Sequence, residues 1–198
     1  MNRFSTSITA VLMLICANGL AAQTPVSVNG SFEQLKNGWP QGWSQHRNAT
    51  LVTVDGGRAI RLGPIAGEPA WVERRIDLDP SWRDLQVSAR MKTSDIQLGD
   101  AAWQNARVLV KFHMPDGKVR YADCPQLSEE TNWTTRSVRL KVPDGATSLT
   151  LSPGVYGKAG TLWIDDLQLI ANPTVEATAP TEGQLTISDA TRIGNFDR

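Results

Sequence analysis

The chain of 198 residues is poor in cysteine and histidine, with two of each. Cys16 lies in an N-terminal segment that we expect to be removed, so Cys124 has no intramolecular partner and the fold must be held by its core. No histidine or helix start flanks Cys124, which favours a small buried apolar side chain over a reactive thiol. Two histidines also do not make a histidine-rich zinc site.

The sequence also lacks a long apolar run. Residues 1–22 have the features of an export signal: a polar, positive start at Asn2 and Arg3, an apolar stretch over 8–16, and small residues over 19–22 that suit cleavage. The stretch is shorter than the about 20 residues that span a bilayer, and no second candidate follows it. We therefore predict no membrane span and a secreted or periplasmic bacterial protein.

Neither sign of charge is in excess. The chain has 20 basic and 20 acidic residues, and removal of residues 1–22 takes away Arg3 and no acid, which leaves 19 − 20, a net charge of −1. Nothing in this balance favours nucleic acid as a partner. The remaining length suits one domain, which we place at 23–171, followed by a Pro/Thr/Ala-rich linker or tail at 172–198. The tail is predicted to be an added strand, a disordered segment or the start of a further domain.

Helical periodicity is missing, and an alternation of period two takes its place from Val26 to Ile170. Gly, Pro, Asp and Asn interrupt the pattern at short intervals, as in Asp55-Gly56-Gly57 and Pro143-Asp144-Gly145, and such residues favour turns. The pattern predicts an all-β, antiparallel sandwich. The expected strands are 49–54, 58–62, 71–78, 85–93, 106–114, 119–123, 134–142, 147–152 and 161–170.

Alternation also predicts which side chains face the core, because successive residues of a strand point to opposite faces. The expected core positions are Val87, Ala89, Met91, Val108, Val110, Phe112, Val138, Leu140, Val142, Leu149 and Leu151. The opposite faces of three of these strands carry cations.

Six short motifs follow one another along the predicted domain. They are Asn29-Gly30-Ser31-Phe32-Glu33, Pro40-Gln41-Gly42-Trp43, Gly57-Arg58-Ala59-Ile60-Arg61-Leu62, Trp133-Thr134, Val142-Pro143-Asp144-Gly145-Ala146 and Trp163-Ile164-Asp165-Asp166-Leu167. In this order the motifs resemble secreted carbohydrate-binding modules of families four, nine and twenty-two, which are jelly rolls of the galactose-binding-like superfamily. The resemblance covers about 26–170 and bears more on the fold than on the ligand.

The resemblance implies a module that binds a polysaccharide or glycan without cleaving it and that often accompanies a catalytic domain or enzyme partner. It also implies a structural calcium between the N-terminal segment and the last strand, with Asn29, Glu33 and Asp165 at the matching positions. Strand parity places Asp165 inward with Trp163, and a buried carboxylate needs compensation that an oxygen-liganded calcium supplies. The alternative is that Asp165 caps backbone N–H groups of the 29–32 turn without a metal.

Seven tryptophans suggest sugar contact, since sugar rings stack on flat aromatic faces. We expect Trp39, Trp43, Trp133 and Trp163 in the core, and Trp82 over one end of the sandwich. The candidates for sugar contact are Trp71, Trp103 and Tyr121, with a core or edge position as the alternative for each.

The outward cations Arg90, Lys111, His113 and Arg139 are expected side by side across one sheet. Because a guanidinium pairs well with carboxylate or sulfate, such a row favours an acidic glycan. The alternative is an ordinary solvated face.

No catalytic motif is present: the sequence has no nucleophile elbow and no phosphate-binding Gly-rich loop. The main prediction is thus an exported, non-catalytic carbohydrate-binding module. The alternatives are a structural or adhesive envelope protein that uses the same sandwich for protein contacts and, more distantly, a small jelly-roll glycosidase or lyase, which needs a pair of carboxylates.

Overall fold

The structure is a computed structural model that describes residues 24–46, 48–64 and 68–173. The predicted export signal and residues 174–198 of the predicted tail lie outside the described residues. The described part contains strands and no helix, and hence no helix that could cross a membrane. Its strands are β1 (Thr24–Val26), β2 (Leu35–Lys36), β3 (Trp39–Pro40), β4 (Ala49–Val54), β5 (Gly57–Leu62), β6 (Ala70–Trp71), β7 (Arg74–Asp77), β8 (Asp84–Gln97), β9 (Ala106–His113), β10 (Val119–Ala122), β11 (Gln126–Leu127), β12 (Thr131–Lys141), β13 (Ser148–Val155) and β14 (Ala159–Ala171).

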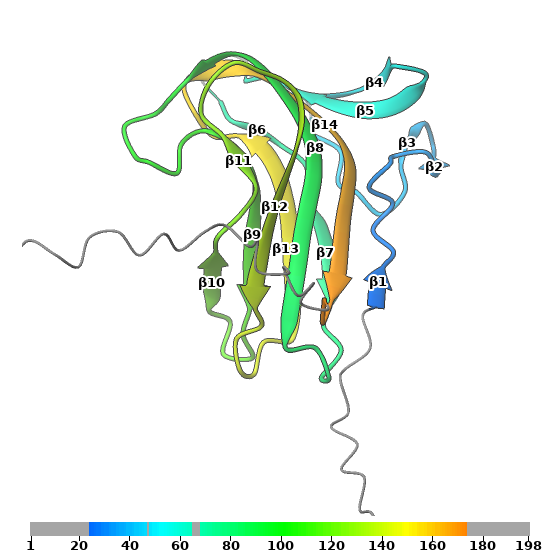
Figure 1. Cartoon of the computed structure of the whole chain (residues 1–198), viewed down its shortest axis with the longest axis vertical. Helices are drawn as coiled ribbons and strands as arrows, with labels where there is room; N and C mark the ends of the chain where they lie inside the picture. Colours follow the sequence, from blue (N-terminus) through cyan, green and yellow to red (C-terminus); the bar gives the residue numbers. More distant parts are fainter. Residues whose placement is uncertain (1–23, 47, 65–67, 174–198) are drawn as a thin grey trace, which may run out of the picture.

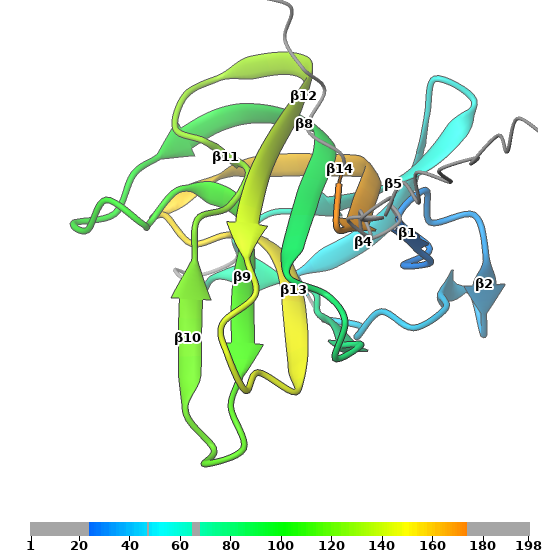
Figure 2. The same cartoon turned by 60° about the horizontal axis from the view of Figure 1, so that its bottom comes forward.

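Two antiparallel sheets form the sandwich (Figure 1). The first sheet has the order β12-β8-β14-β5-β4, with β1 on β14. The second sheet has the order β10-β9-β13-β6, with β11 also on β9 and β7 also on β13. A short β2–β3 hairpin lies apart from the two sheets, on the side of β1 (Figure 1), and Figure 2 shows β2 on the same side. The predicted all-β jelly roll is therefore confirmed.

Most predicted strands match observed ones to within a few residues, but the strand predicted over 71–78 is interrupted. The backbone N–H of Glu73 donates to Ser44 Oγ at 2.7 Å, and its carbonyl accepts the N–H of Ser44 at 2.8 Å. These contacts replace pairing with β13 at Glu73, so the chain pairs as β6 before this residue and as β7 after it.

The core lies between the sheets, where the alternation predicted it. Of the eleven predicted core positions, Val138 and Val142 are partly buried and the others are buried. Trp39 and Trp43 are buried as expected, and the indole of Trp43 donates to the carbonyl of Val28 at 3.0 Å. Trp82 is partly buried against the core, and Cys124 is buried at 6 % exposure. Burial raises the pKa of the Cys124 thiol, which agrees with an unreactive side chain.

The inward orientation predicted for Asp165 and Trp163 is wrong. Leu162 and Ile164 point into the core, and Leu167 and Leu169 do so as well, so the alternation changes phase between them. A register shift between Asp165 and Gln168 causes the change, and Asp166 has a φ of 46° there. Such a bulge adds one residue to a strand, so parity counted through it assigns the wrong face. Asp165 and Trp163 therefore lie on the outer face of the first sheet.

The first and last motifs of the sequence meet at Gly30. The N–H of Leu167 donates to the Gly30 carbonyl at 3.0 Å. A Cβ on Gly30 would lie 1.8 Å from the carbonyl oxygen of Leu167, so only glycine fits at this approach. Phe32, two residues later, is fully buried and packs edge-on against Trp43, with ring centroids 5.5 Å apart. The hydrogen bond between Leu167 and Gly30 therefore joins the turn of the first motif to β14, and Phe32 anchors that turn in the core.

Candidate functional site

The outer face of the second sheet, which we name the groove face, carries its side chains in rows across the strands. Directly paired residues point to the same side of a sheet, so the register defines each row. From one end of β9 to the other, the rows are Arg107, Gly154 and Trp71; then Leu109 and Ser152; then Tyr121, Lys111, Thr150 and Arg75; and last Val119, His113, Ser148 and Asp77. The six residue-to-residue steps from Arg107 to His113 correspond to a length of about 20 Å.

One end of the groove face is aromatic and hollowed. Two adjoining hollows of about 240 and 650 Å³ share Leu109, Tyr121 and Tyr156 in their linings. Trp71 lines the smaller hollow and Trp103 the larger one. Tyr121 and Trp103 are the most exposed large aromatic residues of the described part, at 68 % and 53 %.

Gly154 shapes this end of the face. A Cβ at this position would lie 2.9 Å from Trp71 Cβ and 2.9 Å from the ring of Tyr156. The absence of a side chain therefore lets both rings approach the floor of the sheet. The ring of Trp71 is also stacked on His46, with centroids 4.6 Å apart and an interplanar angle of 28°. The orientation of Trp71 is thus fixed by protein contacts.

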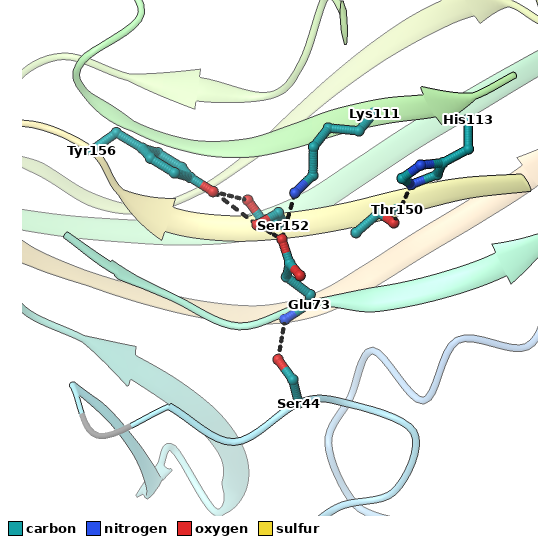
Figure 3. A network of polar contacts seen from close by, with 7 residues as sticks. All are labelled: Ser44, Glu73, Lys111, His113, Thr150, Ser152 and Tyr156. Atoms are coloured by element: carbon teal, nitrogen blue, oxygen red, sulfur yellow. Dashed lines mark hydrogen bonds and ion pairs between the residues drawn. The ribbon is translucent and has the colours of Figure 1, made fainter. Parts of the chain in front are cut away.

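A polar network connects the hollows to the middle of the face (Figure 3). Glu73 forms an ion pair with Lys111, and its Oε1 accepts the hydroxyl of Ser152 at 3.4 Å. The Tyr156 hydroxyl contacts Ser152 Oγ at 2.8 Å and donates to the Ser152 carbonyl at 3.0 Å. Burial raises the pKa of Tyr156 far above its usual value, so the phenol remains neutral. The network offers an ion pair and hydroxyl groups at the floor of an aromatic groove.

The other end of the groove face is polar, and we call Arg75, His113, Ser148 and Thr150 the polar end. Arg75 Nε donates to Ser148 Oγ at 3.1 Å, and His113 Nε2 lies 2.8 Å from Thr150 Oγ1 (Figure 3). Burial lowers the pKa of His113, and the positive charges of Arg75 and Lys111 lower it further. Arg75 of β7 and Lys111 of β9 therefore both act on His113.

Five of the predicted ligand-binding residues come together on the groove face. They are Trp71, Trp103, Tyr121, Lys111 and His113. Whether they bind a ligand stays a prediction.

The expectation that Arg90 and Arg139 lie beside Lys111 and His113 is wrong, because β8 and β12 belong to the first sheet. Arg90 lies 4.4 Å from the centroid of the Trp133 ring and pairs with Asp55 at 3.0 Å. Arg139 donates to the carbonyl of Pro173 at 2.8 Å. Alternation shows that a side chain points outward, but it does not show from which sheet.

Trp133 and Trp163 were also expected in the core, and both are partly exposed instead. Arg61 and Lys92 lie 5.9 and 5.5 Å from the Trp163 ring centroid, on the strands that flank β14. Cation–π contacts of this kind suit the outer face of a sheet better than its core.

Several groove-face residues were not predicted as ligand contacts. Glu73 and Arg75 follow Trp71 at intervals of two residues and therefore share its face. Ser148, Thr150 and Ser152 are interleaved with the core leucines of β13 and therefore point to the opposite face. The alternation in the sequence thus already indicated that these side chains point outward. Alternation also places Arg107 on the outward side of its strand, but it gave no sign that the side chain is buried. Arg107 is 9 % exposed, and its guanidinium donates to Asn105 Oδ1 at 2.7 Å and Gln126 Oε1 at 2.6 Å. These partners lie in loops and edges that alternation does not position.

The three residues predicted to bind calcium all have protein partners. Glu33 contacts the backbone N–H and the guanidinium of Arg58, and the Asn29 amide bonds the backbone of Gln34 and Gln41. Asp165 Oδ1 accepts the N–H of Asp166 at 2.7 Å, and Oδ2 faces Arg90 at 3.4 Å.

The protein contacts of Glu33 and Asp165 affect how well these carboxylates could bind a metal ion. Burial raises the pKa of Asp165, so this carboxylate holds its proton more firmly than an exposed one. Guanidinium groups already compensate Glu33 and Asp165, and they compete with a cation for the same oxygens. Across the described ranges, no group of three or more His, Cys, Asp or Glu side chains is placed to hold a metal ion.

No protein-family model and no curated protein matches the chain. Among solved structures, a family 16 carbohydrate-binding module 2 is similar, with 21 % identity, a TM-score of 0.52, and coverage of 72 % of this chain and 96 % of that one. The CBM22-1 xylan-binding domain of Paenibacillus barcinonensis Xyn10C has 15 % identity and a TM-score of 0.49 over 73 % of this chain and 93 % of that one.

A third similar structure is the enzymatically active domain of bacteriophage CBA120 tailspike protein 4, at 19 % identity and a TM-score of 0.48, over 73 % of this chain and 21 % of that one. At such identities a likeness shows the fold alone. The chain thus has the jelly-roll fold of carbohydrate-binding modules.

Proposed function

We propose that this protein is an exported, non-catalytic carbohydrate-binding module that binds a polysaccharide or glycan on its groove face. The observation that carries the proposal is the hollow whose lining combines Trp71, Tyr121 and Tyr156 with Glu73 and Lys111. Aromatic faces suit the C–H surfaces of sugar rings, and a few placed polar groups fix the orientation of a ligand in an otherwise apolar site. Similarity of the fold to carbohydrate-binding modules supports the same function.

The linings of the two hollows support binding without cleavage. Glu73 is the only acidic residue among the described residues that line them. Its carboxylate is paired with Lys111. Glycoside hydrolysis by the common mechanisms needs two carboxyl groups on either side of the scissile bond. One paired carboxylate does not meet this requirement.

A glycan array and affinity electrophoresis with the wild-type protein test the proposal. We expect retention by at least one polysaccharide and no release of reducing ends during incubation. The absence of binding to every polysaccharide would contradict the proposal and favour the envelope-protein alternative, in which Trp103 and Tyr121 contact a protein. Release of reducing ends would favour an enzyme.

The calcium prediction stays part of the proposal as a structural ion near Asn29, Glu33 and Asp165. A ligand that binds only the native state stabilises it by mass action, so calcium binding predicts a lower melting temperature in EDTA than in calcium chloride. Replacing Glu33 by alanine should remove this difference. Identical melting curves in EDTA and calcium for the wild-type protein would show that Arg58 and Arg90 are sufficient partners for the carboxylates.

A further inference from the structure

The polar end of the groove face contains a cation whose charge is not neutralised by a close partner. Arg75 is exposed, and its Nε is held by Ser148 Oγ. Within residues 24–46, 48–64 and 68–173, its two Nη atoms have no hydrogen bond and the guanidinium has no ion pair. By contrast, Lys111 is paired with Glu73, and the Arg107 guanidinium is surrounded by acceptors. Arg75 is therefore oriented by the protein and still able to bind an anion.

His113 and Thr150 lie beside this guanidinium. Thr150 pairs with Arg75 across β13 and β7, and its hydroxyl contacts the His113 ring. Arg75 and Lys111 act on His113 with positive potential, and Glu73 acts with the opposite sign but more weakly. The other acid of this region, Asp77, pairs with Ser148 at the exposed edge strand. The charges that face His113 thus sum to an environment that favours an added negative group.

We propose that the polar end is an anion subsite that binds the carboxylate of a uronic acid in the glycan, with Arg75 as the principal donor and Thr150 and His113 beside it. The inference rests on the proposed function, since the aromatic end of the same face holds the neighbouring sugar rings. A guanidinium with free Nη donors matches the two oxygens of a carboxylate. The subsite adjoins the smaller hollow through Lys111, which lines that hollow and pairs with Thr150.

Matched glycans isolate the charge of the ligand. Alginate, polygalacturonate and a glucuronic-acid-bearing xylan are each compared with the same polymer after reduction of its carboxyl groups to alcohols, which leaves linkage and length unchanged. We expect the wild-type protein to bind at least one native polymer about tenfold more tightly than its reduced form, the effect of losing one charge-assisted contact. Arg75→Gln should abolish the difference and retain binding to the reduced polymer.

Arg61→Gln is the matched control, because Arg61 is an exposed cation of the first sheet and its loss changes the net charge equally. This variant should bind like the wild type. Equal loss in Arg61→Gln and Arg75→Gln, or equal binding of dextran sulfate and the native polymer, would indicate general charge attraction and overturn the subsite. Equal binding of native and reduced polymers would also overturn it, but would leave the proposed function intact. The absence of binding to any polymer would contradict the proposed function itself.

Titration of His113 by NMR gives a second readout. A carboxylate held at the polar end opposes the effect of Arg75 and Lys111, so the native oligosaccharide should raise the pKa of His113 and the reduced one should not. By linkage, binding of the native glycan should strengthen as pH falls through the pKa of His113. A His113 pKa unaffected by saturating native oligosaccharide would place the carboxylate elsewhere.

Discussion

Trp71→Ala will weaken glycan binding by roughly thirtyfold or more, the loss expected for an aromatic residue at the centre of a binding site. Trp71 lines the smaller hollow together with Glu73 and Tyr121. The strands that carry Trp71 and Tyr121, β6 and β10, are at opposite ends of the strand order of the second sheet. Its ring is oriented by His46 on one side and by the glycine at position 154, which leaves room for the indole. An oriented aromatic face binds without the entropy cost of ordering a mobile side chain.

Affinity electrophoresis and isothermal titration with the best glycan of the array measure this effect. Trp163→Ala is the control, because it removes the same side chain from the outer face of the first sheet. It should leave affinity unchanged, and Trp71→Phe should retain part of it. Melting curves of all three variants check that they are folded. If a folded Trp71→Ala protein binds as the wild type does, the groove face is not the binding site.

Gly30→Ala will destabilise the protein by about 3 kcal/mol or more, at the upper end of the usual cost of inserting a methyl group into a packed site. The added Cβ would lie 1.8 Å from the oxygen, 2.6 Å from the carbon and 2.9 Å from the Cα of Leu167. All three are backbone atoms of β14, so no side-chain rotation relieves the overlap. The N-terminal segment or β14 must move, and the hydrogen bond between Leu167 and Gly30 is then lost.

Thermal and urea unfolding measure this change. For a chain of this size, about 3 kcal/mol corresponds to a fall in Tm of roughly 10 °C. Ser31→Ala is the matched control, since Ser31 is the exposed neighbour in the same turn and should change Tm little. A Gly30→Ala protein with the Tm of the wild type would show that the segment adjusts without cost, and would refute the account of how the first and last motifs meet.

The prediction of the fold succeeded because burial in this protein follows local alternation. Val108, Val110 and Phe112 point inward on one long strand, and Leu149 and Leu151 do so on its neighbour. Prediction failed where the backbone departs from regular pleating. The three-residue step from Ile164 to Leu167 was the visible sign of the bulge, since two inward residues of a regular strand are separated by an even number of positions.

The candidate site was predicted only in part. Trp71 and Lys111 were correctly expected on outer faces, but Arg90 was expected beside Lys111 and lies on the opposite sheet. The pattern of polar and apolar residues along a strand does not depend on which strands it pairs with. No local pattern therefore distinguishes the outer face of one sheet from that of the other.

The amino-acid sequence by itself determined the all-β class, the positions of most strands and turns, and the inward side of each regular strand. These properties depend on residues a few positions apart, where steric preference and alternation act directly. The tertiary structure alone decided that β9 pairs with β13 and β8 with β14, and hence that Arg75, Lys111 and His113 share a face with Trp71 whereas Arg90 and Arg139 do not. Strand pairing joins residues far apart in the chain, and its energy comes from burying both sheets together.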